Sequence, residues 1–264
     1  MDIFSALKRK ANTLNYFINS FNGIEYFANI LSKVLPDFHN LKVLKLNIIT
    51  DDLEYHLKTS RFQHLEILQI DYIRVNAINC MIRNSGGRLK KILIAEFEIY
   101  DCDFYEESLL LIRTVRENCP LIGYLSLVFL TSDEHFLELD NLLRTCHYLK
   151  VLILETFDNF DDKDEGIYEG MKLASGEKIL NVLIRSAPIN LNVIGIFYDF
   201  NFPINILREF LENWKGRSAL SFLISNDEYE NEEFKALIDQ YKDNGVIKEF
   251  GRCYAENIID NFGI

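Results

Sequence analysis

The sequence predicts an α/β solenoid, in which short parallel strands alternate with helices along one axis. Three observations carry this prediction. One short apolar phrase recurs along the chain, its copies return at intervals of a few tens of residues, and the segments between them have the apolar period of helices. Self-similarity with a period of 20–50 residues is typical of solenoids and related repeat arrays.

The recurring phrase places apolar residues at its first, fourth and sixth positions. Leu41, Leu65 and Leu89 open three copies that lie 24 residues apart. Further copies begin at Ile122, Leu149 and Leu191, a weaker one at Leu220, and fainter ones at Leu14 and Ile247. Because successive strand residues point to opposite faces, each copy predicts a short strand with one buried face. This phrase at this spacing marks leucine-rich repeats.

Between the phrases the apolar residues change to helical spacing. Five stripes show it, at Ile24–Leu35, Phe136–Leu143, Ile179–Ile184, Leu207–Trp214 and Phe234–Tyr241. Strand followed by helix, repeated, gives parallel strands joined by right-handed crossovers. The expected fold is therefore a right-handed leucine-rich-repeat horseshoe, with strands on the concave face and helices on the convex face.

The repeats extend along the whole chain, so we expect one domain over residues 1–264, built from about eight or nine irregular repeats. Polar caps normally cover the terminal repeats of a solenoid. Few residues precede the Leu14 copy, and only Asn244–Ile264 offers a cap at the other end, so capping is expected to be weak.

Composition limits the kinds of partner that the protein is expected to bind. The formal net charge of −12 disfavours nucleic acid, since phosphate binding needs a basic surface. No apolar stretch approaches the ~20 residues that span a bilayer, and no signal peptide is recognisable. The five cysteines form no C-x-x-C pair. We therefore expect an intracellular protein, cytoplasmic or nuclear, that binds neither nucleic acid nor membrane.

No constellation of catalytic or metal-binding residues emerges. The acidic run Asp158–Glu169 does not fit the spacing of a calcium-binding EF-hand loop. His39, His64 and His147 each precede a strand, which indicates a repeated structural role. Phosphate-binding glycine loops and nucleophile motifs are missing from the sequence. The expectation is a non-enzymatic protein without cofactor or metal.

One pre-strand position holds cysteine or phenylalanine in four copies of the phrase. Cys119 and Cys146 lie three residues before the first position of a phrase, and other copies place Phe38, Phe62, Gly86 and Pro188 there. A position with this choice is expected to be buried and apolar, as free cysteine often is.

The concave face offers the expected binding surface. Its side chains come from the positions between the buried ones, and from the third full copy onward they are mostly apolar. Exposed apolar patches rimmed by charge mark interaction sites, and aromatic residues often dominate their energy. The expected protein-binding residues are Leu93, Tyr124, Ile153, Phe197 and Phe222, with Asp71 and Glu155 as acidic neighbours. The alternative is that neighbouring strands pack these side chains together, or that loops fold over the face.

The strand phrase, the Cys-x-x-Leu placement and the helix–strand spacing resemble the cysteine-containing leucine-rich repeats of F-box proteins. Leu7–Phe17 and Ile184–Leu191 are similar to segments of the large fungal families of F-box-like repeat proteins. The resemblance implies a substrate receptor of a cullin-RING ubiquitin ligase, whose repeats hold the target. The F-box itself is not seen, so assembly into a ligase is expected only if one lies upstream.

The expected function is thus a protein–protein interaction module, which holds a protein partner on its concave face. The alternative is a ligase-independent scaffold or inhibitor of the ribonuclease-inhibitor type.

Overall fold

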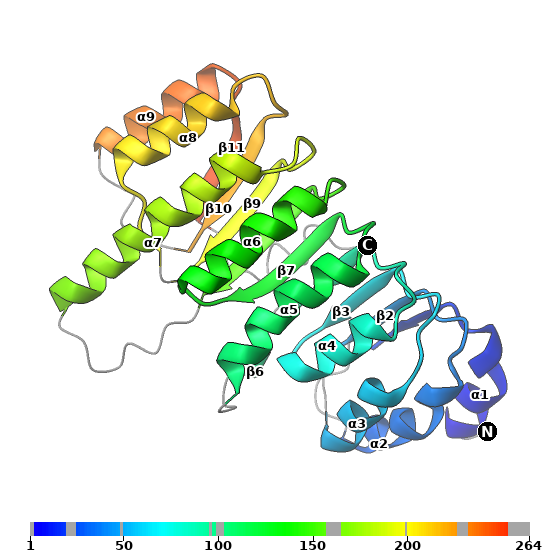
Figure 1. Cartoon of the computed structure of the whole chain (residues 1–264). Coiled ribbons are helices and arrows are strands. Elements are labelled where there is room, and N and C mark those ends of the chain that lie inside the picture. Colours follow the sequence, from blue (N-terminus) through cyan, green and yellow to red (C-terminus); the bar gives the residue numbers. More distant parts are fainter. Residues whose placement is uncertain are drawn as a thin grey trace. The chain divides into compact units, whose positions relative to one another are not determined.

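The computed structural model is shown in Figure 1. It describes residues 3–19, 25–47, 50–94, 97–98, 103–156, 165–198, 200–225 and 232–252. The chain divides into two compact units, Met1–Leu125 and Ser126–Ile264.

The described residues form an α/β fold with a parallel nine-stranded sheet that is not closed into a barrel. The strand order is β1-β2-β3-β5-β7-β8-β9-β10-β11 and follows the chain, while β4 and β6 form a small separate pair. Sequential parallel strands with a helix in most connections are what the alternation of strand and helix patterns predicted.

The first unit contains four predicted strands together with the beginning of a fifth. Its elements are α1 (Ile3–Lys10), the 3-10 turn Ala11–Thr13, β1 (Tyr16–Ile18), α2 (Glu25–Val34), the 3-10 turn Leu35–Asp37, β2 (Val43–Leu46), α3 (Asp51–Thr59), β3 (Ile67–Ile70), β4 (Ile73–Arg74), α4 (Val75–Arg83), β5 (Lys91–Leu93), β6 (Phe97–Glu98), α5 (Phe104–Asn118) and the start of β7 (Tyr124–Phe129).

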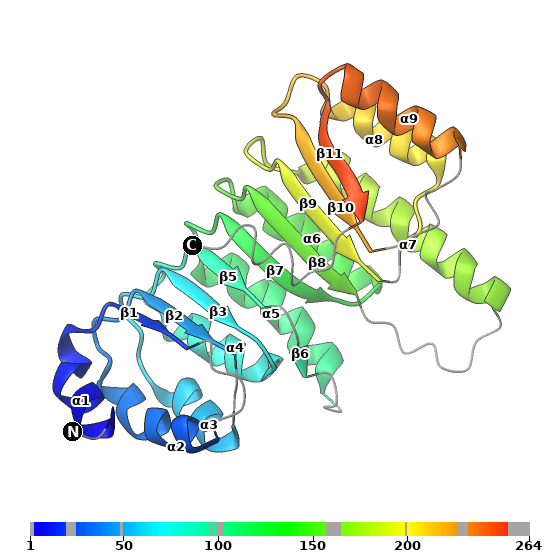
Figure 2. The ribbon, with the colours of Figure 1, turned by 180° about the vertical axis from the view of Figure 1, so that it is seen from behind.

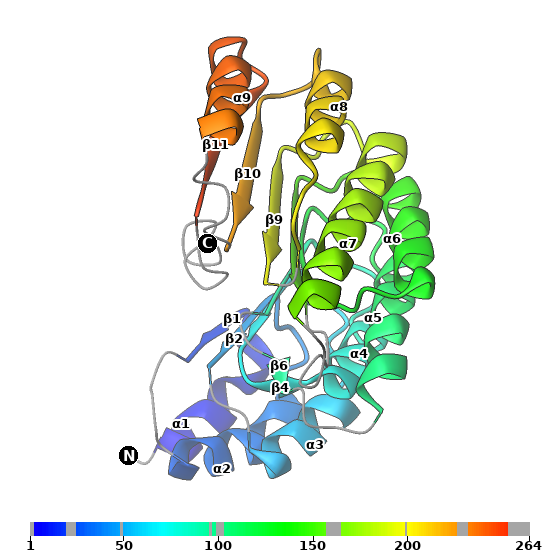
Figure 3. The same cartoon turned by 90° about the vertical axis from the view of Figure 1, so that its left-hand side faces the viewer.

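The second unit continues the alternation with longer strands. Its elements after β7 are α6 (Asp133–Thr145), β8 (Val151–Thr156), α7 (Glu165–Ser186), β9 (Val193–Phe197), α8 (Ile204–Trp214), β10 (Leu220–Ile224), α9 (Glu232–Asp243) and β11 (Ile247–Arg252). In both units the helices lie against one face of the strands: Figure 1 looks onto the helices and Figure 2 onto the strands. Figure 3 shows α4 and α5, and separately α6 and α7, on that same side of their own strands.

The turns that lead into several of the strands share the same hydrogen bond. The amide of Leu65 donates to the carbonyl of Phe62 at 3.0 Å, and that of Leu149 donates to Cys146 at 3.1 Å. Ile122 donates to Cys119 in the same way, also at 3.1 Å. The predicted buried pre-strand position is confirmed: Phe38 and Phe62 are buried, and so are Cys119 and Cys146.

A second repeated hydrogen-bond pattern fixes the register between strands. The carbonyl of Lys42 accepts from Glu66 and Ile67 at 2.8 and 3.0 Å, and that of Glu66 accepts from Lys90 and Lys91 at 2.8 and 3.1 Å. In the second unit the carbonyl of Lys150 accepts two amides of the next repeat in the same way. These bonds satisfy the backbone groups just ahead of the strands.

The helix-facing side of each strand builds the core. In the first unit the register aligns Leu44, Leu68 and Ile92, and all three are fully buried. Leu152 is paired with Ile194 in the second unit, and both are again fully buried. The residues at the fourth position of the phrase therefore form the core row that the pattern predicted.

The predicted face of Phe222 is wrong. In the register of β10, Phe222 pairs with Ile194, and Ile224 pairs with Ile196, so both occupy the core row. The ring of Phe222 lies 5.9 Å from that of Phe210 on α8. A shift of one residue sends every side chain of a strand to the other face. The weak phrase that begins at Leu220 had been aligned one residue too late.

Candidate interaction surface

The strand face of the first unit that points away from the helices is partly open, although Val43 and Leu93 on it are buried. Tyr16 and Ile18 of β1 are 63% and 59% exposed. Further along the same face, five side chains are half-buried. We call the following seven residues the open strand face: Tyr16, Ile18, Lys45, Ile67, Gln69, Lys91 and Tyr124.

The register arranges these residues in two rows across the strands. One row runs Tyr16, Val43, Ile67, Lys91 and Tyr124. The other runs Ile18, Lys45, Gln69 and Leu93. Lys45 on β2 and Lys91 on β5 therefore lie on either side of β3, in adjacent rows.

Lys91 contacts an aromatic ring on the neighbouring strand. Its Nζ lies 4.2 Å from the centre of the Tyr124 ring, which is the geometry of a cation–π contact. Partial burial lowers the pKa of Lys91 below its ordinary value, and the positive charge of Lys45 lowers it further. The charge of Lys45 thus disfavours the charged form of Lys91.

Gln69 lies between the two lysines in the middle of the face. Its Oε1 atom is buried and has no hydrogen-bond partner. A buried acceptor without a donor costs free energy. A ligand with an N–H group would remove that cost.

The equivalent face of the second unit is closed. Val151, Ile153 and Glu155 of β8 are at most 2% exposed, and on β9 Val193 is 6% and Phe197 1% exposed. These are the in-between positions of the strand phrases, paired across β8 and β9. The same strand face is therefore partly exposed in the first unit and buried in the second.

The structure separates the seven predicted binding residues into three groups. Tyr124 and Asp71 are half-buried and reach the surface of the first unit. The expected exposure is wrong for Leu93, Ile153, Phe197 and Glu155, because all four are buried on the predicted face. Phe222 lies on the opposite face, as described above. Whether these residues bind a protein stays a prediction.

The predicted binding residues include only Tyr124 of the open strand face and miss the other six: Tyr16, Ile18, Lys45, Ile67, Gln69 and Lys91. The fainter phrase at Leu14 contained the first two, since Tyr16 lies between its apolar positions. Both lysines were assigned to the concave face but set aside in favour of apolar side chains. The useful signal was the one polar residue in each of β2, β3 and β5, namely Lys45, Gln69 and Lys91, because polar side chains on one face of a strand are typical of a sheet with a solvated face.

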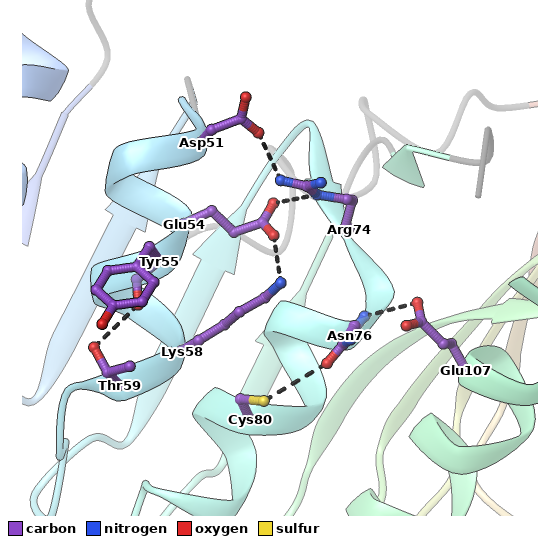
Figure 4. A network of polar contacts seen from close by, with 9 residues as sticks. All are labelled: Asp51, Glu54, Tyr55, Lys58, Thr59, Arg74, Asn76, Cys80 and Glu107. Carbon is purple, nitrogen blue, oxygen red and sulfur yellow. Dashed lines mark hydrogen bonds and ion pairs between the residues drawn. The ribbon is translucent and has the colours of Figure 1, made fainter. Parts of the chain in front are cut away.

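A polar network holds the carboxyl-terminal side of the same strands (Figure 4). The buried Glu54 of α3 accepts from Arg74 Nε at 2.9 Å, and Lys58 Nζ lies 2.8 Å from its other oxygen. Arg74 also donates to Asp51 at 2.7 Å. Since Arg74 ends β4 and directly precedes α4, the network fixes the segment after Asp71. A buried carboxylate with two cationic partners is satisfied, so this cluster is structural.

A shallow polar hollow lies at the other end of the strands in the first unit. It has a volume of about 420 Å³ and is lined by Asn12, Thr13, Asn15, Asn40, Lys42 and His64. The Asn40 side chain donates to the carbonyl of Asn12 at 2.7 Å across it. Its lining amides and backbone groups bond to each other, which makes it a part of the pre-strand turns.

The residues considered for chemistry lie apart from one another. His39, His64 and His147 lie in the turns before β2, β3 and β8, as predicted. Within the described ranges, no three His, Cys, Asp or Glu side chains converge in a way that would hold a metal ion. The acidic run lies outside the described residues from Asp158 to Asp164.

No protein-family model and no curated protein matches this chain. None of the helices in the described part of the chain combines the length and the apolar character needed to cross a membrane.

Proposed function

We propose that this chain is a protein-binding module of the leucine-rich-repeat type. On this proposal its strands and helices belong to a right-handed solenoid, and the strand face binds the partner. The resemblance to F-box-like repeat proteins suggests the role of the substrate-recognition half of a ubiquitin-ligase receptor. The proposal includes no catalytic step, cofactor or metal.

The open strand face of the first unit is the observation that carries the proposal. It combines exposed apolar and aromatic side chains with unpaired charge on hydrogen-bonded strands that hold them in fixed register. Aromatic and apolar anchors surrounded by polar groups are typical of interfaces between proteins. Parallel strands also place successive repeats side by side, so one partner can contact several of them.

A second candidate, a ligase-independent scaffold or inhibitor, rests on the same surface. The two candidates differ in whether the bound complex contains the adaptor of a cullin-RING ligase.

Site-specific photo-crosslinking tests the proposal. A benzophenone amino acid replaces Tyr16 or Tyr124 on the open strand face, and Leu137 on the outer side of α6 serves as a control, since it is 61% exposed, close to Tyr16 at 63%. We expect the strand positions to capture a protein that the helix position does not. Mass spectrometry then shows whether a ligase adaptor accompanies it.

The captured protein is then purified and its affinity measured. Tyr16→Ala and Tyr124→Ala are expected to weaken binding by about tenfold or more, since truncation of an aromatic anchor costs on the order of 2 kcal/mol. Lys235→Ala on α9 is expected to leave affinity unchanged. If the Leu137 position captures the partner and the strand positions do not, the assigned face is wrong.

A further inference from the structure

We propose that the open strand face of the first unit binds an extended segment of a partner protein whose acidic side chain is held between Lys45 and Lys91. This inference rests on the proposed protein-binding function and adds the chemistry of the partner. It reverses the expectation from Asp71 and Glu155, which had pointed to a basic partner.

The first support is that both lysines lack a carboxylate partner among the described residues. Two other lysines of the unit are paired: Lys58 lies 2.8 Å from Glu54 and Lys90 lies 2.6 Å from Glu66. No side chain of the described residues forms an ion pair with Lys45 or Lys91. The chain has 40 acidic and 28 basic residues, so carboxylates are abundant. Two unpaired cations on one face of an acidic protein are therefore a site for an external anion.

The second support is the spacing of the two lysines. They lie on β2 and β5, which are both neighbours of β3. Adjacent strands are about 4.8 Å apart and the two rows are about 6.6 Å apart along the strands, so the two Cα atoms are separated by about 12 Å. Each lysine has a flexible four-carbon stem, and both ammonium groups can therefore reach one carboxylate above β3. The pKa of Lys91, which burial and the charge of Lys45 lower, agrees with two ammonium groups in proximity.

The third support is the surroundings of the lysine pair. Tyr16 and Ile18 lie on one side of it and Tyr124 on the other, which provides apolar contacts for residues that flank an acidic side chain. The half-buried side chain of Gln69 lies on the same face, next to Lys45 in its row. From β1 to β7 the face crosses four strand spacings, about 19 Å, which is the length of about six extended residues.

The chemistry of the face favours a carboxylate over a phosphate group. Sites that recognise phosphorylated peptides are typically built from arginine, whose planar guanidinium binds phosphate with two hydrogen bonds. The open strand face contains two lysines and no arginine. Lysine acts as a compact charge and suits a single carboxylate between two strands.

A peptide array tests the inference with peptides that share their flanking residues and differ only in the central residue. The probes are fluorescein-labelled heptapeptides with varied apolar flanks and a central Glu, Gln, Lys or phosphoserine, and binding is measured by fluorescence anisotropy at low salt. We expect the tightest peptides to contain Glu and to bind about tenfold more tightly than their Gln counterparts. The double variant Lys45→Gln/Lys91→Gln is expected to lose this preference, and Lys235→Gln, a control on α9, to keep it. Thermal melts confirm that each variant is folded.

The outcomes separate the inference from the proposed function. If no Glu peptide binds more tightly than its Gln counterpart, or if only phosphoserine peptides bind, the acidic-segment inference is overturned. If a partner captured through Tyr16 binds the double lysine variant with unchanged affinity, the protein-binding function stands and the inference fails. If neither cross-linking nor the array finds binding on this face, both fail.

Discussion

The strand faces of the two units have opposite environments although the same phrase builds both. In the first unit β2 reads Val-Leu-Lys-Leu and β3 reads Ile-Leu-Gln-Ile, so each strand has one polar side chain, Lys45 or Gln69, on the face away from the helices, and both are partly exposed. In the second unit β8 begins Val-Leu-Ile-Leu and β9 reads Val-Ile-Gly-Ile-Phe. Strands that are apolar on both sides are typical of sheets that are buried on both faces. The comparison teaches that exposure of a repeat face depends on the residues between the core positions, and the core phrase alone does not fix it.

The comparison also changes where a partner is expected to bind. Apolar side chains such as Ile153 and Phe197 had been expected to anchor a partner, yet they are buried within their own unit. The open face retains Lys45 and Lys91, which contribute less to a core. In this protein, side chains that the core does not need indicate a binding surface better than the apolar residues of the strands do.

The largest expected effect tests the corrected register of the second unit. Phe222→Ala removes a fully buried ring that contacts Phe210 of α8 and Phe250 of β11. We expect the free energy of unfolding to fall by about 3–5 kcal/mol, as for other buried phenylalanines. The measurement is denaturant unfolding, with Ser221→Ala as the control on the opposite face of β10.

A loss of less than about 0.5 kcal/mol, the scale of surface substitutions, would contradict a core position for Phe222. It would restore the original alignment, in which Phe222 is exposed to a partner.

A second prediction compares the two units directly with one substitution. Ile153 in the second unit is fully buried, whereas Ile67 in the first unit is half-buried on the same kind of face. Ile153→Ala is expected to cost about 2–5 kcal/mol because it leaves a cavity. Ile67→Ala is expected to cost about 1 kcal/mol, since only part of its apolar area is removed from water.

Denaturant melts of the two variants measure this difference. Equal losses of stability would mean that the two faces are covered to the same extent, and the distinction between an open and a closed face would fail.

Much of the fold could be predicted because the core phrase has a strong physical signature. Leu44, Leu68 and Leu152 occupy the buried row that the phrase placed them in. The helix stripe at Leu207–Trp214 matches α8 almost residue for residue. The repeated place of Cys119 and Cys146 was enough to predict burial of both thiols. Local periodicity fixes such features because each depends on only one strand or helix.

The candidate site was predicted less well, for two physical reasons. At Leu220 the phrase offers two registers one residue apart, and only pairing with β9 selects the one that buries Phe222 and Ile224. Alternation identifies which side of a strand Ile153 occupies but not what covers that side. The register at Leu220 and the cover over Ile153 both depend on tertiary contacts, which a local sequence pattern does not specify.

The smallest expected effect concerns the cost of keeping Lys91 on the open strand face. Burial and the charge of Lys45 lower the pKa of Lys91 in the folded protein. The unfolded chain then binds more protons than the folded one at pH values between the lowered pKa and the ordinary value of 10.5. Stability that is linked to this group therefore rises as pH increases through that window.

Lys91→Met removes the titrating group and tests this linkage. At neutral pH the variant escapes the unfavourable burial of charge but loses the contact with the Tyr124 ring, so the net change is expected to stay within about 1 kcal/mol. The informative quantity is the slope: relative to Lys91→Met, the wild type is expected to gain stability from neutral pH to above pH 10.5. Urea unfolding at several pH values measures it, and Lys45→Met is expected to reduce the slope by removing the like charge.

A slope of the opposite sign would mean that a neighbouring carboxylate stabilises the charged lysine. That result would remove the physical reason to expect an acidic partner, because the cation would already be neutralised within its own unit.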